Sequence, residues 1–262
     1  MIFLYNLILY KPIFNFFVGL YNILPGHDIG IVILIMTIVI RLVLYPLTNS
    51  SIKSQKSLQE LQPKMNEIKK LYAKDQQKQA QALMELYKQN KVNPFSSCLP
   101  LLIQLPILIA LYSVMRNGLT LTDLGGDLYS FVSNPGQLNP VSLGFLNMAK
   151  PNIILALFAG AAQFWQTKML TRKQAPKEAG PGAKDEDMMA MMNKQMLYMM
   201  PVMTVVIGAS LPAGLTLYWL FSTVFTALQQ MFLFKKPSDN PPAPSVPTSP
   251  NVIEGTVIEE KK

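Results

Sequence analysis

The side chain with the greatest chemical consequence in this sequence is Arg41, which interrupts the apolar run Ile29–Leu47. Thr37 lies one helical turn before it and adds a hydroxyl group to the same stretch. An arginine at the centre of a membrane-spanning helix costs on the order of 3 kcal/mol, so it needs an anion, water or a route to the head groups. Two interpretations are open. The long side chain reaches the polar boundary at Thr48, or a water-filled pocket receives it.

Neutral polar side chains interrupt other apolar runs: Gln104 lies in one of them, and Gln163 and Gln166 lie near the end of another. These runs contain no Asp or Glu, so no carboxylate within them can neutralise Arg41. Glutamines alone often hold membrane helices together, each contributing about 0.6–2 kcal/mol. In combination with an unpaired arginine, they favour a polar groove.

Tyr218 and Trp219 lie one turn into the last apolar run. Aromatic residues are common at the membrane interface, which explains this pair without a binding role. The alternative is that both side chains line the polar groove.

The apolar runs that carry these residues are long enough to cross a membrane. Half of the 262 residues are hydrophobic, 15% are charged and the formal net charge is +8, a balance typical of a small membrane protein with basic loops. A helix of about 20 apolar residues crosses a hydrocarbon core of about 30 Å. The sequence therefore predicts an all-α, polytopic membrane protein whose five core transmembrane helices cover about residues 29–48, 97–116, 151–170, 192–210 and 214–234.

Residues 1–28 are predicted to form an N-terminal amphipathic helix that lies in the membrane interface. Lys11-Pro12 is expected to divide this apolar stretch into pieces that are too short to span, and its aromatic residues suit head-group depth. The alternative is an extra kinked span, which would place the N-terminus on the opposite side of the membrane.

Residues 49–95 are predicted to form a helical hairpin outside the membrane. Apolar residues recur there at three- and four-residue steps, as on one face of a helix, before and after a polar break at residues 73–76. Pro63 is expected to bend or restart the first arm. The two apolar stripes consist of Leu58, Leu61, Met65, Ile68 and Tyr72, and of Ala80, Leu83, Met84 and Tyr87.

The surface of this hairpin is predicted to be basic, because the segment holds nine lysines and four acidic residues. Such a surface fits anionic head groups, ribosomal RNA or simply water. The candidate positions for recruiting a partner are Lys64, Lys69, Lys70 and Lys74.

The distribution of basic residues predicts the orientation of the chain, since cytoplasmic loops are enriched in Lys and Arg. These residues concentrate in 49–95, 168–194 and 235–236, and they are absent from 117–149 and 211–214. The hairpin is therefore predicted to be cytoplasmic and the N-terminus external. The proline-rich residues 237–262 are predicted to form a disordered cytoplasmic tail.

The sequence lacks the residues that known intramembrane enzymes require. A single histidine, His27, and a single cysteine, Cys98, cannot form a metal site or a disulfide framework. A serine protease would need a buried Ser–His pair and an aspartyl protease two aspartates within the spans, and the spans contain neither histidine nor aspartate. We therefore expect a protein that is not an enzyme, has no catalytic residue, and needs no cofactor or metal.

Five stretches of the sequence carry a more specific signal: TIVIRLVLYPLT, LQPKMNEIK, LYKQNKVNPFSSCLPLLIQLPILIALY, MPVMTVV and LPAGLTLYW. In order and spacing they resemble the YidC/Oxa1/Alb3 family of membrane protein insertases. The resemblance extends from about residue 29 to residue 234 and includes charged and proline positions as well as apolar ones.

The resemblance implies a five-helix core, a cytoplasmic hairpin, and a groove that receives the hydrophilic part of an incoming chain while its apolar part enters lipid. Arg41 would be the groove arginine and Thr37 the groove hydroxyl. Gln104 would be the polar position of the second core helix, and Trp219 an aromatic position on the substrate path. The implied function is the insertion of nascent transmembrane segments into the inner membrane of a bacterium without nucleotide hydrolysis.

The implied partners are nascent membrane-protein clients and membrane lipids, with the ribosome and the Sec translocon as further candidates and without DNA or a small-molecule substrate. Two other functional classes stay open. A small channel or transporter could use the same groove, although secondary transporters usually carry carboxylates in their spans. A structural assembly factor would hold partner helices together and would tolerate the substitution Arg41→Ala.

Overall fold

The computed structural model describes residues 2–93, 99–120, 124, 126–171 and 197–235, and within these ranges it is mostly helical. Its helices are α1 (Ile2–Tyr5), the π-helical turn η1 (Asn6–Tyr10), α2 (Lys11–Ile23), α3 (Ile29–Val43), α4 (Tyr45–Leu71), α5 (Gln76–Gln89), α6 (Leu99–Thr120), α7 (Ile153–Thr171), a helix at Leu197–Gly208, and α9 (Ala213–Lys235). The short strands β1 (Val141–Ser142) and β2 (Leu146–Asn147) pair antiparallel. The all-α prediction is confirmed.

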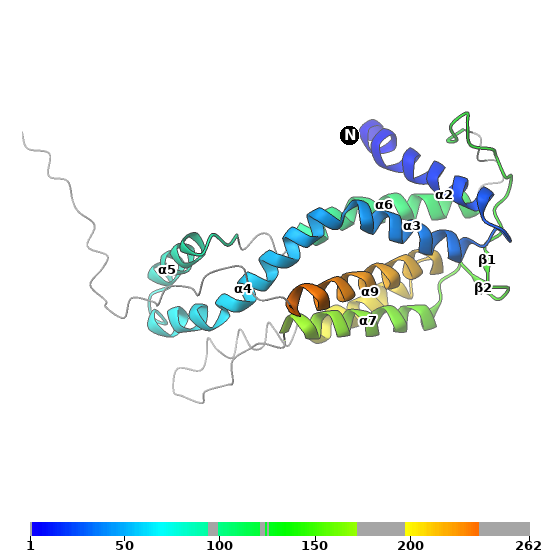
Figure 1. Ribbon diagram of the computed structural model, residues 1–262. Helices are drawn as coiled ribbons and strands as arrows, with labels where there is room; N and C mark the ends of the chain where they lie inside the picture. The colour runs from blue at the N-terminus through cyan, green and yellow to red at the C-terminus, as the bar shows by residue number, and fades with distance from the viewer. Residues whose placement is uncertain (1, 94–98, 121–123, 125, 172–196, 236–262) are drawn as a thin grey trace, which may run out of the picture.

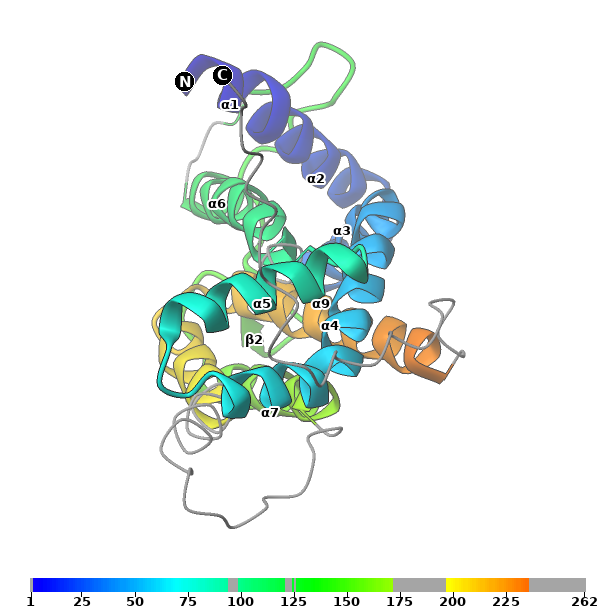
Figure 2. The ribbon, with the colours of Figure 1, turned by 90° about the vertical axis from the view of Figure 1, so that its left-hand side faces the viewer.

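Helices α3, α6, α7 and α9 run along roughly one direction and form a bundle (Figure 1). Within it, α9 makes its most extensive contacts with α7 and α3. Helices α4 and α5 project from one end of the bundle, which we call the hairpin end, while β1 and β2 lie at the opposite end, which we call the loop end (Figure 1). Figure 2, seen from the hairpin end, shows α4 and α5 in front of the bundle.

Among the described residues, four helices are long and apolar enough to cross a membrane: Phe3–Ile23, Leu102–Leu119, Ile153–Leu170 and Ala213–Phe234. The last three overlap the predicted spans 97–116, 151–170 and 214–234. The predicted span 192–210 is described only from residue 197, as the shorter apolar helix Leu197–Gly208. A polytopic membrane protein is confirmed, and the number of core helices stays a prediction.

The apolar run 29–48 is not one continuous helix. Its first part, α3, is capped by Asp28, whose side chain accepts the N–H groups of Gly30 and Ile31. After Val43 the chain bends by 68° into α4. Pro46 in the first turn of α4 lacks the N–H that would extend the hydrogen-bond ladder of α3. The bend therefore joins the bundle directly to the first arm of the hairpin.

The expected division of the N-terminal segment at Lys11-Pro12 is wrong, because the helix continues from Ile2 to Ile23. The π-helical turn η1 directly precedes α2, and a widened turn accommodates a proline that lacks an N–H. One face of this helix packs into the main core through Phe14, Phe17, Val18 and Tyr21. Its length now permits the extra kinked span, and placement in the interface stays a prediction.

Helices α4 and α5 form a helical hairpin as predicted, although its first arm starts earlier than expected, at Tyr45. Its position outside the membrane stays a prediction. Pro63 lies inside α4 without restarting the helix. The arms pack through a core of their own, in which Leu61, Ile68, Leu86 and Val92 are buried. Two residues of the predicted second stripe, Ala80 and Met84, are exposed instead. Ala82, Leu83 and Leu86 face α4 instead, and Asp75 caps the start of α5.

The loop between residues 117 and 149 contains some regular structure. Helix α6 extends to Thr120, and β1 and β2 form a small hairpin. The loop is also joined to the N-terminal helix through Asn15, a buried side chain that donates to the backbone oxygens of Lys11 and Asp127, both at 2.9 Å, and accepts the N–H of Tyr129 at 2.6 Å. Polar contacts of this kind could not be read from hydropathy alone.

Candidate functional site

The predicted key residue, Arg41, is the centre of a polar cluster that joins three helices. From α3, its Nε donates to Ser222 Oγ on α9 at 2.9 Å, and a terminal nitrogen donates to the same hydroxyl. That terminal nitrogen also lies 3.4 Å from Gln104 Oε1 on α6. Gln104 Nε2 in turn donates to the hydroxyl of Tyr218, also on α9, at 2.7 Å. We call Arg41, Gln104, Tyr218 and Ser222 the arginine cluster.

The side chain of Arg41 turns into the bundle and not toward the polar boundary at Thr48. Only 9% of Arg41 is exposed, and its hydrogen-bond partners Ser222 and Gln104 are neutral. Helices α3, α6, α7 and α9 contain no Asp or Glu. An ionic charge without a counter-ion in a low-dielectric interior attracts an incoming anion strongly. The first interpretation from the sequence, a side chain that extends to the head groups, is therefore not what the structure shows.

The arrangement is a compact cluster, whereas the sequence predicted an open groove. Tyr218 and Ser222 are buried together with Arg41 and Thr37. The physical reason is that hydrogen-bonding groups of α6 and α9 surround the guanidinium where the sequence suggested water. Access for a ligand would therefore require the helices around Arg41 to separate.

The surroundings of the arginine cluster differ on its two sides. Toward the loop end, Tyr218 lines a narrow apolar gap together with Ile33, Met36, Leu111, Met115, Gly214 and Leu215. Toward the hairpin end, a second polar contact follows, in which Gln229 Nε2 of α9 donates to Thr48 Oγ1 of α4 at 3.3 Å. In the described part of the chain, a polar contact between α4 and α9 thus adjoins the arginine cluster on its hairpin side, whereas the gap on its other side is apolar.

Ser222 and Gln229 are site residues that the sequence reasoning missed. Tyr218, Ser222, Thr226 and Gln229 recur at steps of three and four residues, which places them on one face of α9. This polar stripe within an apolar helix was the signal that could have identified them.

The remaining predicted groove residues do not join the arginine cluster in the described part of the chain. Thr37 is buried one turn before Arg41, but its hydroxyl donates to the backbone oxygen of Ile33 at 2.6 Å. Gln163 bonds within α7, to Thr167 at 3.4 Å. Gln166 and Trp219 are half-buried, on α7 and α9. The structure therefore brings together Arg41, Gln104 and Tyr218 from the predicted set.

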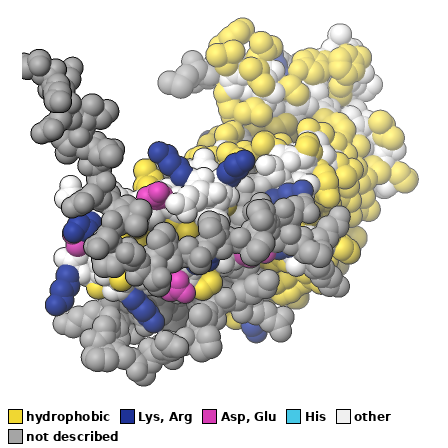
Figure 3. All heavy atoms as spheres, turned by 60° about the vertical axis from the view of Figure 1, so that its left-hand side comes forward, with side chains coloured by type: hydrophobic (Ala, Val, Ile, Leu, Met, Phe, Trp, Pro, Cys, Tyr) yellow, Lys and Arg dark blue, Asp and Glu magenta, His cyan; other side chains and the backbone are white. Residues whose placement is uncertain are grey.

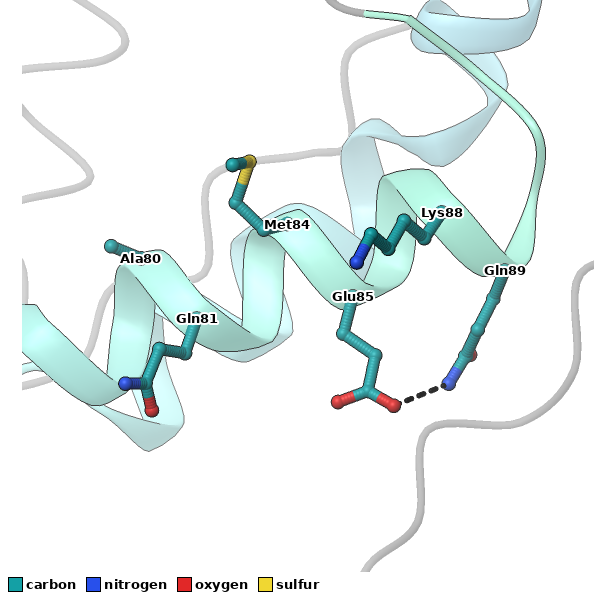
Figure 4. A pocket seen from close by; sticks show the side chains of 6 residues that line it. All are labelled: Ala80, Gln81, Met84, Glu85, Lys88 and Gln89. Carbon is teal, nitrogen blue, oxygen red and sulfur yellow. Dashed lines mark hydrogen bonds between the residues drawn. The ribbon is translucent and has the colours of Figure 1, made fainter.

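The hairpin presents a mixed basic surface, as Figure 3 shows for one face of the molecule, where Lys and Arg side chains gather away from the apolar bundle. Of the four candidate lysines, Lys70 and Lys74 are exposed and Lys64 and Lys69 are half-buried. On the outer face of α5, a shallow hollow is lined by Ala80, Gln81, Met84, Glu85, Lys88 and Gln89 (Figure 4). Within it, Gln89 Nε2 donates to Glu85 Oε1 at 3.3 Å.

Among the described residues, no group of three or more His, Cys, Asp or Glu side chains is placed to hold a metal ion. The arginine cluster also has no nucleophile paired with a general base, since its hydroxyls face a guanidinium and an amide. Its chemistry is that of a fixed cation surrounded by neutral hydrogen-bonding groups.

The sequence matches the family of the 60Kd inner membrane protein over residues 19–240. It is 36% identical to the membrane protein insertase YidC of Fusobacterium nucleatum over 236 residues, which cover 90% of this chain and 99% of that protein. It is 32% identical to YidC of Magnetococcus marinus over 217 residues, 82% of this chain and 34% of that relative. This chain thus spans about a third of the length of the latter protein.

The fold is also similar to a solved structure, a crystal structure of an active YidC insertase with its first transmembrane domain resolved. The TM-score is 0.55 and the sequence identity 26%, over 86% of this chain and 45% of that one. The family match, the relatives and the solved structure all indicate the same family. The chain belongs to the family of the bacterial 60Kd inner membrane protein, the YidC membrane protein insertases.

Proposed function

We propose that this chain moves the transmembrane segments of newly made membrane proteins into the lipid bilayer, and that the arginine cluster receives the polar part of the client. The observation that carries this proposal is the environment of Arg41, a buried cation whose hydrogen-bond partners Ser222 and Gln104 are neutral. A charge held in this way has hydrogen bonds but no negative partner among them, so a client carboxylate that reaches it gains a strong interaction.

The proposed role of the cluster is to lower a barrier. Moving a polar segment across hydrocarbon is costly, and a hydrogen-bonding site inside the bundle shortens the apolar distance. The net driving force is the burial of the client's own apolar span in lipid, about 25 cal/mol for each Å² removed from water. Nucleotide hydrolysis is therefore not required for this step.

We further propose that Gln104 separates from Arg41 when a client enters. Their contact, at 3.4 Å, is longer than the 2.9 Å bond between Arg41 and Ser222. The opening would expose the predicted groove residues that lie outside the cluster, Thr37, Gln163, Gln166 and Trp219.

The proposed orientation has the hairpin end in the cytoplasm. The polar path from Arg41 continues toward Thr48 and Gln229 at that end, and the basic residues of the chain gather there, as cytoplasmic loops require. A client emerging in the cytoplasm would therefore meet the polar side of the bundle first. The N-terminus would be external if the first helix lies in the interface.

The hairpin is proposed to recruit clients or the ribosome and the Sec translocon that deliver them. The exposed Lys70 and Lys74 suit anionic partners. Deleting residues 58–90 should reduce insertion while the bundle keeps its thermal stability. Unchanged insertion after this deletion would exclude a recruiting role.

The experiment that tests the function uses the full chain in liposomes and a single-span client with a short acidic external tail. Arg41→Ala should abolish insertion, and Arg41→Lys should retain most of it, because the positive charge is kept. The matched control is Arg116→Ala, which removes an exposed arginine near the end of α6 and should leave insertion unchanged. Equal insertion by all variants would contradict the electrostatic mechanism. Ion flux without any client would favour the channel class instead.

A further inference from the structure

The tip of the hairpin formed by β1 and β2 exposes large apolar side chains at the loop end of the bundle. Strand residues Ser142 and Leu146 pair, so that Leu143, Gly144 and Phe145 form the connection between the strands. Leu143 is 66% exposed and Phe145 79% exposed. Turns that face water are normally built from Gly, Asn, Asp, Ser and Pro. Two exposed, large apolar residues in such a turn therefore indicate that it contacts something other than water.

The backbone at this tip is held in an unusual conformation. Leu143 has a φ of +51°, in the left-handed region that residues other than Gly, Asn and Asp rarely adopt. Its N–H donates to Asp28 Oδ2 at 2.6 Å, and the hydroxyl of Ser142 donates to the other oxygen of the same carboxylate. Asp28 thus holds the backbone at the position that presents Leu143 outward.

The base of this hairpin is fixed to the bundle. Met148 is buried, and its backbone oxygen accepts the N–H of Gly214 at the start of α9 at 3.0 Å. Asp28 ties the other strand to the start of α3. The exposed tip is therefore presented rigidly at the level where two bundle helices begin, at the loop end (Figure 1).

The chemistry of the surroundings fits a lipid surface. Between residues 128 and 149 the sequence contains no charged residue, so the tip itself brings no charge into the head-group layer. The neighbouring Asp28 carboxylate is held by hydrogen bonds from Ser142 and Leu143. The first turn of α7 follows closely in sequence and exposes Ile153 and Ile154, which lie on a predicted membrane-crossing helix. On segments that lie in the membrane interface, Trp, Phe and Leu are the side chains that enter the boundary between head groups and acyl chains.

We infer that Leu143 and Phe145 insert into the head-group layer of the bilayer at the loop end and fix the bundle at its depth in the membrane. The contact extends the lipid-facing apolar surface of α7 beyond the end of the helix. This contact requires neither a client nor the proposed insertase mechanism, because it depends only on the exposed tip and on helices that cross the membrane.

The test places an environment-sensitive dye at Phe145. In a Cys98→Ser background, which removes the single native cysteine, Phe145→Cys is labelled with nitrobenzoxadiazole and the full chain is reconstituted into vesicles of phosphatidylcholine and phosphatidylglycerol. The control Gln137→Cys lies at an exposed polar position of the same loop. Ile154→Cys, on the exposed face of α7, supplies the reference for lipid contact.

The expected result is blue-shifted emission at position 145, with strong quenching by lipids that carry a nitroxide near the head group and weak quenching by aqueous iodide. Position 137 should show the opposite pattern. If position 145 is quenched by iodide as readily as position 137, the tip lies in water and the inference is overturned. Protection of position 145 from both quenchers would overturn it as well, in favour of a protein contact.

Discussion

Arg41 and Ser222 lie 181 positions apart in the sequence, yet Arg41 Nε donates to Ser222 Oγ at 2.9 Å. The bond joins α3 to α9 and directs a permanent charge into the interior of the bundle. Because burial of an unpaired charge opposes stability, this arrangement is expected where the charge has a task that outweighs its cost. Function and stability should therefore respond differently to changes at these two residues.

Replacing Arg41 by Met should affect client insertion and protein stability in opposite ways. The substitution keeps a long side chain and removes the buried charge. The free energy of unfolding should therefore stay the same or rise by as much as about 4 kcal/mol. Client insertion in liposomes should be lost. Unfolding in detergent, followed by circular dichroism, measures the first effect. A variant that loses both stability and insertion would show that Arg41 is structural.

Ser222→Ala should destabilise the protein by about 1–3 kcal/mol, since the guanidinium then loses its shortest hydrogen bonds. In an Arg41→Met background the same change should cost much less, because no buried cation remains to be satisfied. The difference between the two values is the coupling energy of a double-mutant cycle. Equal costs in both backgrounds would mean that the two residues act independently.

Gly160 allows close approach of α7 and the helix Leu197–Gly208. A Cβ atom added to it would overlap the side chain of Val205 and lie 3.2 Å from the backbone oxygen of Pro201. Gly160→Ala should therefore destabilise the bundle by about 1–3 kcal/mol. Gly19→Ala is the matched control, since a Cβ there meets nothing within 4 Å, and helix propensity should make it neutral or stabilising by up to about 1 kcal/mol.

The hairpin offers a direct test of its corrected packing. Leu86→Ala removes a buried side chain and should destabilise the hairpin by about 2 kcal/mol or more. Met84→Ala, two residues earlier, removes a side chain that is 65% exposed and should change little. Amide hydrogen exchange in α4 and α5 distinguishes the two. Faster exchange in Met84→Ala than in Leu86→Ala would restore the stripe predicted from the sequence.

The Asp28 carboxylate makes the loop end sensitive to strong acid. Burial raises its pKa, but bonds from the N–H of Leu143, the hydroxyl of Ser142 and the N–H groups of Ile31 and Gly30 outweigh this effect, so the pKa lies below its ordinary value of 3.8. As the pH falls, the carboxyl group of Asp28 therefore takes up its proton at a higher pH in the unfolded state than in the folded state. The stabilisation is complete above the ordinary pKa and is lost as the pH falls through the lowered one.

Wild-type protein should consequently lose more thermal stability than Asp28→Asn between about pH 5 and pH 2. Hydrogen exchange at Leu143 and Phe145 should rise over the same interval. Parallel stability curves for the two proteins would show that the carboxylate does not contribute in this way.

The sequence alone determined the class of the fold and the residue at its centre. Long apolar runs with basic connections require membrane-crossing helices, because hydrocarbon leaves the backbone no other hydrogen-bond partners. The same argument singled out Arg41, since a charge in such a run is too costly to be incidental. Periodicity also predicted the hairpin, because its first stripe repeats with a helical period that local spacing reveals.

Only the tertiary structure decided which side chains meet. Gln104, Tyr218 and Ser222 come from α6 and α9, and nothing in local spacing states that they surround Arg41. The tertiary structure also decided which face of α5 packs against α4, so that Leu86 is buried there in place of the predicted Met84. At Lys11-Pro12, a π-helical turn preserved a helix that proline was expected to divide. Partners distant in sequence are chosen by packing, which acts only once the helices have been brought together.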